Sequence, residues 1–263
     1  MTFPQGVVTT RELVVLDFET TGLTPAFDRT IEVAATLLLD HRPVETFHQL
    51  MYPGKSLPSF ITSLTGITDA MLRGQPRPGQ VMPRLHQFVR GLPIVAHNAA
   101  FDRGFLHAEL ARVGLRLESE FLCTLRLARR LVPGLPSYRL DALVDALQVR
   151  VPDARQFHRS IADVNHTVAI WQSLHARFTE HTGLATPPVS LLCTLMRKPK
   201  KQVPNYLAAL KAGVAATARH RPSTRDRKVL QARTGRPGGV PTASTWSREP
   251  GVASLALGSI QLA

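Results

Sequence analysis

The stretch from Val14 to Gly22 reads VVLDFETTG, an apolar run that ends in two acidic residues and a Thr-Thr-Gly turn. The acidic residues, Asp17 and Glu19, are two positions apart, and such residues project from the same face of a β-strand. Two carboxylates this close repel each other, so a cation between them is expected. Oxygen ligands of this kind suit Mg²⁺ or Mn²⁺. The alternative is a strand end with two solvated acids.

A second segment places an acidic residue at the start of a predicted helix. Residues 93–106 read PIVAHNAAFDRGFL, in which a short apolar strand leads through His97 and Asn98 to a helix. Asn98 is a suitable N-cap residue, and Asp102 in the first turn would interact favourably with the helix dipole. Taken alone, Asp102 therefore has a structural explanation.

A third segment, residues 157–171, reads FHRSIADVNHTVAIW. His158 and Asp163 are five residues apart, across a loop-to-helix entry that Ser160 can cap. Apolar residues then recur at steps of three and four, which predicts a helix that faces the core. Asp163 falls at the margin of this apolar stripe, where a capping or solvated acid is the ordinary explanation.

Together, the three segments resemble the exonuclease motifs of the DnaQ-like DEDDh 3′–5′ exonucleases. The shared motifs are Asp17-x-Glu19-Thr20-Thr21-Gly22, His97-Asn98-x-x-Phe101-Asp102 and His158-x4-Asp163, with supporting matches at residues 64–68 (LTGIT) and 135–141 (LPSYRLD). The likeness spans about residues 12–182, with the motifs in the order of the family. Within this family the chain is similar to the proofreading ε subunit of bacterial DNA polymerase III.

The resemblance implies an enzyme that hydrolyses phosphodiester bonds with two divalent metal ions. Two ions about 3.5–4 Å apart can stabilise the charge on both the attacking and the leaving oxygen. By this resemblance, Asp17, Glu19 and Asp163 would bind one ion. Asp17 would bridge to the second ion, which Asp102 would help to hold. Mg²⁺ is the expected ion, and Mn²⁺ is expected to substitute for it.

His158 is the candidate general base, because a histidine side chain ordinarily titrates near neutral pH. The chain has ten histidines; His158 stands out through its offset of five residues before Asp163. The related DEDDy class would have Tyr at this position. His97 also matches a family position, but its pairing with Asn98 indicates positioning rather than proton transfer.

The resemblance also implies contacts to a single-stranded or frayed nucleic-acid 3′ end. The residues expected to bind this substrate are Thr20, Thr21, Thr65, Asn98 and Phe101. Phe101 has a second interpretation, which is core packing, since Phe105 shares its helical face. A paired end must first unpair at a free-energy cost, so single-stranded ends are favoured.

Periodicity predicts an α/β fold with a mixed central sheet flanked by helices, consistent with the ribonuclease-H-like fold of the family. The expected strands are residues 13–18, 31–39, 44–51, 93–96 and 120–123, with a hairpin turn at 40–43. The expected helices are residues 81–90, 100–113, 124–131, 140–147 and 160–180. Carboxylates at the ends of these elements would then meet on one side of the sheet.

Composition narrows the class of protein. The chain has 263 residues, of which 44% are hydrophobic, enough for a packed core. Its two cysteines form no metal-binding motif, which argues against a zinc site and fits a reducing compartment. The N-terminus lacks the pattern of a secretory signal, and no apolar stretch is long enough to span a membrane. A cytoplasmic protein without membrane contact is expected.

The composition changes near residue 186. Residues 1–185, the expected exonuclease domain, are nearly neutral, whereas residues 186–263 contribute +11 of the net charge of +13. This basic, proline-rich tail is expected to be largely disordered, with one short helix at 204–216. Its charge would attract phosphate backbones. It could also tether the domain to a DNA polymerase subunit, or it could be a solvated extension without function.

Three functions from different classes follow. The first is a metal-dependent 3′–5′ exonuclease that acts on DNA ends and releases nucleoside 5′-monophosphates, as a proofreading subunit of DNA polymerase III. The second is a stand-alone DEDDh enzyme that trims RNA 3′ ends or short oligonucleotides, because the carboxylates do not distinguish DNA from RNA. The third is a non-catalytic nucleic-acid-binding scaffold. The presence of all four acids and the histidine argues against the scaffold.

Overall fold

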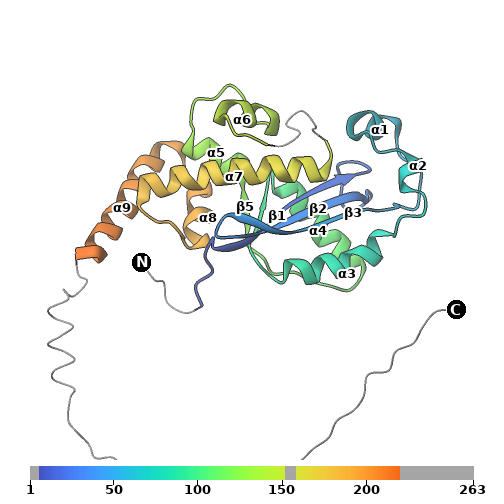
Figure 1. The fold of residues 1–263 in the computed structure, drawn as a ribbon, viewed down its shortest axis with the longest axis horizontal. Helices are drawn as coiled ribbons and strands as arrows, with labels where there is room; N and C mark the ends of the chain where they lie inside the picture. The colour runs from blue at the N-terminus through green and yellow to red at the C-terminus, as the bar shows by residue number, and fades with distance from the viewer. Residues whose placement is uncertain (1–5, 152–157, 220–263) are drawn as a thin grey trace, which may run out of the picture. The chain divides into compact units, whose positions relative to one another are not determined.

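In the computed structural model, which describes residues 6–151 and 158–219, a five-stranded mixed sheet forms the centre (Figure 1). The strand order is β3-β2-β1-β4-β5; β3, β2 and β1 are antiparallel neighbours, and β1, β4 and β5 run parallel. The strands are β1 (Glu12–Thr20), β2 (Thr30–Leu39), β3 (Arg42–Leu50), β4 (Ile94–Ala96) and β5 (Phe121–Cys123).

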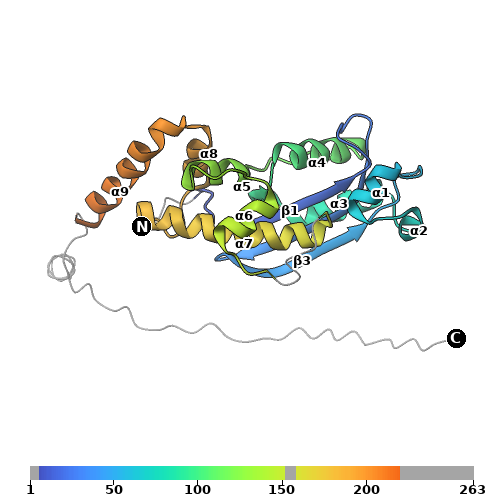
Figure 2. The same cartoon turned by 90° about the horizontal axis from the view of Figure 1, so that it is seen from above.

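Helices cover both faces of this sheet, as the two views show (Figures 1 and 2). On one face α3 and α4 pack over the strands, and on the other the long α7 lies across them together with α5 and α6. The helices are α1 (Ser59–Thr65), α2 (Asp69–Leu72), α3 (Pro78–Val89), α4 (Ala100–Arg112), α5 (Thr124–Leu131), α6 (Leu140–Leu147), α7 (Ser160–Thr182), α8 (Val189–Arg197), the 3₁₀ turn η1 (Lys200–Gln202) and α9 (Val203–Arg219). The predicted mixed sheet flanked by helices is confirmed.

Strand β1 separates two hydrophobic cores, because its side chains alternate between the two faces of the sheet. Leu13 and Val15 belong to the core beneath α7, whereas Val14 and Leu16 belong to the core beneath α3 and α4. Strand β2 is buried on both faces over nine of its ten residues, as expected for a continuous apolar run. The strand that ends in the acidic motif is therefore held rigidly from both sides.

Two predicted helix caps are wrong. Asn98 has φ +59°, a left-handed conformation that asparagine tolerates, and Ala99 rather than Asn98 occupies the N-cap position of α4. At the start of α7 the N-cap residue is Arg159, and no side chain caps this end. The Ser160 side chain makes no hydrogen bond within the described residues, whereas its backbone N–H donates to Glu32. Tertiary contacts thus replace the local capping that the sequence suggested.

The folded part of the chain continues beyond residue 185, where the expected domain ended. Helix α8 packs on α5 and β5, and α9 packs on α7. Both helices bury apolar side chains in the core beneath α7, including Leu192 and Leu195 from α8 and Leu207 from α9. Charge and proline content obscured these contacts, because few apolar residues suffice when they all face one side. The remainder of the predicted tail, residues 220–263, lies outside the described residues.

The described helices include none that combines the length and the apolar character needed to cross a membrane.

Candidate active site

The acidic residues of β1 lie on the face of the sheet that α7 covers. Asp17 and Glu19 alternate with Leu16 and Phe18, whose side chains belong to the opposite core. They therefore continue the row of Val15, beneath α7. The predicted convergence of the two carboxylates follows from this strand geometry.

Asp163 completes the group from the first turn of α7. One carboxylate oxygen each from Asp17, Glu19 and Asp163 lies within 4.8 Å of the others. The second oxygen of Asp163, Oδ2, accepts a hydrogen bond of 3.2 Å from the backbone N–H of His158. Residues separated by more than 140 positions thus form one acidic cluster, as the sequence predicted.

Asp102 lies beside this cluster without belonging to the group of three. It is buried in the first turn of α4, and its Oδ1 accepts a hydrogen bond of 3.3 Å from the backbone N–H of Phe18. This contact fixes the carboxylate between the two acidic residues of β1. The negative charge of Asp102 also contributes to raising the pKa of Asp17 and Glu19.

Burial and mutual repulsion raise the pKa of every acid in the site. Burial, followed by the charges of neighbouring acids, raises the pKa of Asp17 well above its ordinary value and that of Glu19 to about 8. Burial likewise raises the pKa of Asp102 to about 8 and that of Asp163 to about 7. Four acids that resist ionisation at one point form a site that a cation would stabilise.

The donor set fits a hard divalent cation. All the candidate ligands are carboxylate oxygens, which Mg²⁺ and Mn²⁺ prefer. Asp163 Oδ1 is buried and accepts no hydrogen bond within the described residues, although it lies 3.8 Å from Nδ1 of His166. An acceptor left open in this way, among oxygens less than 5 Å apart, is suited to bind a metal ion.

A hollow of about 480 Å³ adjoins the cluster, and His158 contributes to its wall. His158 precedes α7 and has a left-handed backbone, with φ +64°. His97 also lines the hollow; its Nδ1 lies 2.9 Å from Thr124 Oγ1, and burial lowers its pKa to about 4. The lining residues are His97, Asn98, Leu125, Arg129, Arg139, Leu140, Asp141 and His158. A neutral, anchored His97 fits the predicted positioning role.

A sequence model described as an exonuclease, RNase_T, matches residues 14–171, which include all four acids and His158. The chain belongs to this exonuclease family. The family resemblance of the three motifs is therefore confirmed, and the matched residues include those of the acidic cluster described above.

Two relatives of the domain are much longer proteins, and the match covers only a small part of each. DNA polymerase III PolC-type from Caldanaerobacter subterraneus is 36% identical over 169 residues, which cover 64% of this chain and 12% of the relative. The 3′-5′ exonuclease DinG of Bacillus subtilis is 36% identical over 163 residues, which cover 61% of this chain and 17% of the relative. The chain thus spans less than a fifth of the length of these relatives.

Two solved exonuclease structures share the fold of this domain. Exonuclease X, in complex with 5′ overhanging duplex DNA, superposes with a TM-score of 0.53 at 25% identity, over 70% of this chain and 99% of the other. Product-bound exonuclease I gives a TM-score of 0.55 at 23% identity, over 64% of this chain and 44% of the other. The second match shows a shared fold.

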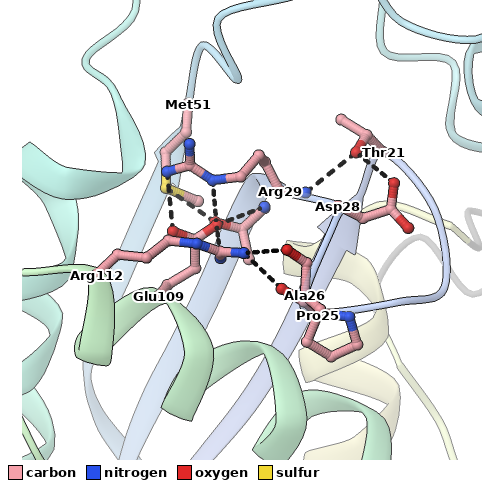
Figure 3. A network of polar contacts seen from close by, with 9 residues as sticks. Thr21, Pro25, Ala26, Asp28, Arg29, Met51, Glu109 and Arg112 are labelled. Atoms are coloured by element: carbon pink, nitrogen blue, oxygen red, sulfur yellow. Dashed lines mark hydrogen bonds and ion pairs between the residues drawn. The ribbon is translucent and has the colours of Figure 1, made fainter.

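Among the residues predicted to bind substrate, the two threonines after Glu19 serve the loop that joins β1 to β2. The Thr20 hydroxyl donates to the carbonyl of Gly22, and the Thr21 hydroxyl donates to Asp28 and accepts from the backbone N–H of Arg29 (Figure 3). Both threonines are buried. These hydroxyls shape the loop beside the exonuclease site, and their contact with a nucleotide stays a prediction.

The other predicted substrate residues lie in different surroundings. Thr65 is buried at the end of α1, where its hydroxyl donates to the carbonyl of Ile61 and accepts from the N–H of Ile67. Phe101 is half-buried, with its ring 4.8 Å from that of Phe105. Core packing accounts for part of the Phe101 surface, and Asn98 lies in the hollow beside His158.

Sequence reasoning missed two buried glutamates that are bound by arginines close to the exonuclease site. Glu32 on β2 contacts Arg159, the residue after His158, and Glu109 on α4 contacts Arg29 at the start of β2. Glu32 lies within an apolar run, and a charged residue in a buried strand needs a partner. From that position a buried ion pair could have been inferred. The identity of the arginine could not.

Proposed function

We propose that the chain is a metal-dependent 3′–5′ exonuclease that hydrolyses the terminal phosphodiester bond of single-stranded DNA and releases nucleoside 5′-monophosphates. The observation that carries the proposal is the group of Asp17, Glu19 and Asp163, whose oxygens lie within 4.8 Å of one another. The relative DinG, a 3′-5′ exonuclease, supports the direction of cleavage, and the complex of exonuclease X with DNA supports the polymer.

The proposed metal site combines two acids from strand β1 with one acid each from helices α4 and α7. Asp17, Glu19 and Asp163 would hold one divalent ion, and Asp17 together with Asp102 would hold a second. When bound, two such ions supply positive charge against the attacking and the leaving oxygen. The Phe18 N–H donates to Asp102, so this carboxylate would be oriented before a metal ion binds.

His158 would act as the general base. The imidazole would take a proton from the attacking water, whose oxygen would bond to phosphorus as the bond between phosphorus and the 3′ oxygen breaks. The leaving 3′ oxygen would then take up a proton from the imidazolium or from solvent, which leaves a 3′ hydroxyl on the shortened strand. Because the backbone N–H of His158 donates to Asp163, the backbone of the proposed base is attached to one of the acids. The adjoining hollow, with Arg129 and Arg139 in its wall, would hold the strand that leads into the site.

The test is digestion of matched single-stranded DNA and RNA oligonucleotides, each labelled at its 5′ end, with Mg²⁺ or Mn²⁺ and with EDTA. We expect a ladder that shortens from the 3′ end, 5′-monophosphate products, no cleavage in EDTA, and faster digestion of DNA. An identically purified Asp163→Asn variant controls for contaminating nucleases. Intact DNA and RNA at saturating Mn²⁺ would exclude the proposed activity, and faster digestion of RNA would assign the enzyme to RNA ends.

Proofreading beside a polymerase is a further part of the proposal. It is supported by the relatives named PolC-type DNA polymerase III, in which the matching segment is about an eighth of the protein. A preference for a mismatched over a paired 3′ terminus is the property that this role requires, and the same assay measures it. Attachment to a polymerase through the basic C-terminal residues stays a prediction.

A further inference from the structure

Glu32 is a fully buried carboxylate that is surrounded by hydrogen-bond donors. Arg159 binds it with two nitrogens: Nε lies 3.2 and 3.1 Å from the two oxygens, and Nη2 lies 2.7 Å from Oε1. The backbone N–H of Ser160 donates to Oε2 at 2.9 Å, and His48 Nε2 lies 2.9 Å from Oε1. Such bidentate, charge-assisted bonds fix geometry as well as charge.

The position of this pair relates it to the proposed chemistry. Glu32 is paired with Glu19 across β2 and β1, so it lies one strand away from the acidic cluster. Arg159 and Ser160, which bind Glu32, are the two residues that directly follow His158. A strand residue therefore holds the chain immediately after the candidate general base, over a separation of 127 positions.

The backbone of His158 needs such a restraint. Its φ of +64° lies in the left-handed region, which is unfavourable for a residue other than glycine. A residue stays in this conformation when its surroundings determine it. Asp163 holds the N–H of His158 on one side, and Glu32 holds Arg159 and Ser160 on the other.

We propose that the Glu32–Arg159 ion pair is a positioning device for His158, which orients the base toward the acidic cluster without touching substrate. This inference rests on the proposed exonuclease function. Glu32 does not belong to the group of acids suited to a metal, and the Arg159 guanidinium is occupied by Glu32. The charges of Glu32 and Arg159 also act on Glu19. The proposed positioning effect is separate from this and acts through the backbone of residues 158–160, which the pair holds.

The experiment is a double-mutant cycle that combines Arg159→Met with His158→Ala, measured on single-stranded DNA at saturating Mn²⁺. We expect Arg159→Met to lower kcat about 10- to 100-fold, because a misplacement of about 1 Å can cost that much. KM should change far less than kcat, since no substrate contact is removed. In the His158→Ala background, Arg159→Met should have almost no further effect on kcat, because the group that it positions is gone.

Arg29→Met is the matched control variant. Arg29 and Arg159 each have a side chain that is 30% exposed, and each binds a fully buried glutamate. Both substitutions therefore remove one arginine from an equivalent pair. Because Arg29 does not hold His158, the effect of Arg29→Met on kcat should multiply with that of His158→Ala. Multiplicative effects for Arg159→Met as well would overturn the positioning role.

A second variant covers the case in which Arg159→Met fails to fold. Glu32→Gln keeps the shape and one acceptor of the side chain while it weakens the grip on Arg159. It should lower kcat by a smaller factor, again without further effect in the His158→Ala background. Unchanged kcat in folded Glu32→Gln would also overturn the proposal. If His158→Ala itself digests DNA at the wild-type rate, the proposed mechanism fails instead, which is a distinguishable result.

Discussion

Two groups of buried acids near the end of β1 differ in what surrounds them. Glu32 and Glu109 are fully buried and each is bound by arginine; Arg29 contacts Glu109 with Nε at 2.9 Å and Nη2 at 3.0 Å (Figure 3). Asp17 and Asp163, by contrast, share their surroundings chiefly with other acids. The contrast separates acids that are paired within the fold from the acids of the proposed metal site.

The two groups also differ in their titration. Although burial raises it, hydrogen bonds from His48, Arg159 and the Ser160 N–H bring the pKa of Glu32 down to about 2. Burial and repulsion instead raise the pKa of Glu19 to about 8. Glu19 and Glu32 are neighbours in register on adjacent strands. The chain thus pairs Glu32 internally, whereas Glu19 has the raised pKa of an acid that the proposed cation would stabilise.

The substitution Asp17→Asn should break this comparison most strongly. It removes a ligand from the proposed metal site, so we expect exonuclease activity to fall by about 10³-fold or more. Because burial and neighbouring acids raise the pKa of Asp17, folding without metal requires this acid to retain a proton, a cost that asparagine avoids. The metal-free variant should therefore melt at a higher temperature than the metal-free wild type. Activity assays in Mn²⁺ and thermal unfolding in EDTA measure the two effects.

Glu109→Gln provides the opposite case. It leaves Arg29 and Arg112 without their carboxylate partner, and Arg112 also donates to the carbonyl of Pro25 in the loop after β1 (Figure 3). We expect it to destabilise the fold by about 1.5–3 kcal/mol. The loss stays below that of a fully buried pair because both arginines are 30% exposed. If Asp17→Asn and Glu109→Gln shift the melting temperature in the same direction, the distinction between the two groups of acids is wrong.

The pH dependence of stability should sharpen the comparison. An acid whose pKa is raised on folding keeps a proton that the unfolded chain releases, so its contribution falls as the pH rises from about 4 toward the folded value. For Glu19 and Asp102 that folded value is about 8. In EDTA, the free energy of unfolding should therefore decrease between pH 7 and pH 8.5, by up to about 1.4 kcal/mol per pH unit for each proton retained.

The buried histidines do not change the free energy of unfolding between pH 7 and pH 8.5. Burial lowers the pKa of His97 and His175 to about 4, so their contribution increases up to about pH 6.5 and is constant above it. Added Mn²⁺ binds deprotonated carboxylates and should stabilise the protein more at pH 8 than at pH 6. Denaturant titrations at both pH values measure this. Equal stabilisation by Mn²⁺ at the two pH values would argue against a carboxylate metal site.

The sequence predicted the acidic cluster because its geometry is local in each part. The spacing of Asp17 and Glu19 determines their common face in a strand, and the positions of Asp102 and Asp163 in first turns follow from the helical patterns. The family motifs then supplied what spacing does not, namely that three distant segments meet. The mixed sheet followed in the same way from the strand and helix patterns.

The features that could not be predicted are those decided by tertiary contacts. Nothing local to Glu32 shows that its partner is Arg159, since the pairing depends on how α7 crosses the sheet. The same holds for the start of α7. The sequence suggested the Ser160 side chain as its cap, whereas in the structure no side chain caps this end and the Ser160 N–H donates to Glu32. Helix α8, by contrast, carries an apolar face in its own sequence and was missed because of the charge and proline content around it.

Truncation after Arg219 should have the smallest effect, and it compares the folded domain with the basic residues that follow. Residues 220–263 carry seven Lys and Arg against two acids. Since these charges would neutralise DNA phosphates, their removal should weaken binding several-fold at low salt. It should also flatten the salt dependence, by about 0.7 in log–log slope for each phosphate of single-stranded DNA that is no longer neutralised. Cutting after Arg219 keeps α8 and α9, which a cut at residue 185 would remove together with part of the core.

The kcat of the truncated protein at saturating oligonucleotide should stay at the full-length value, because the acids and His158 are retained. Fluorescence anisotropy at several salt concentrations measures the slope, and equal slopes for the two proteins would show that these residues do not bind DNA.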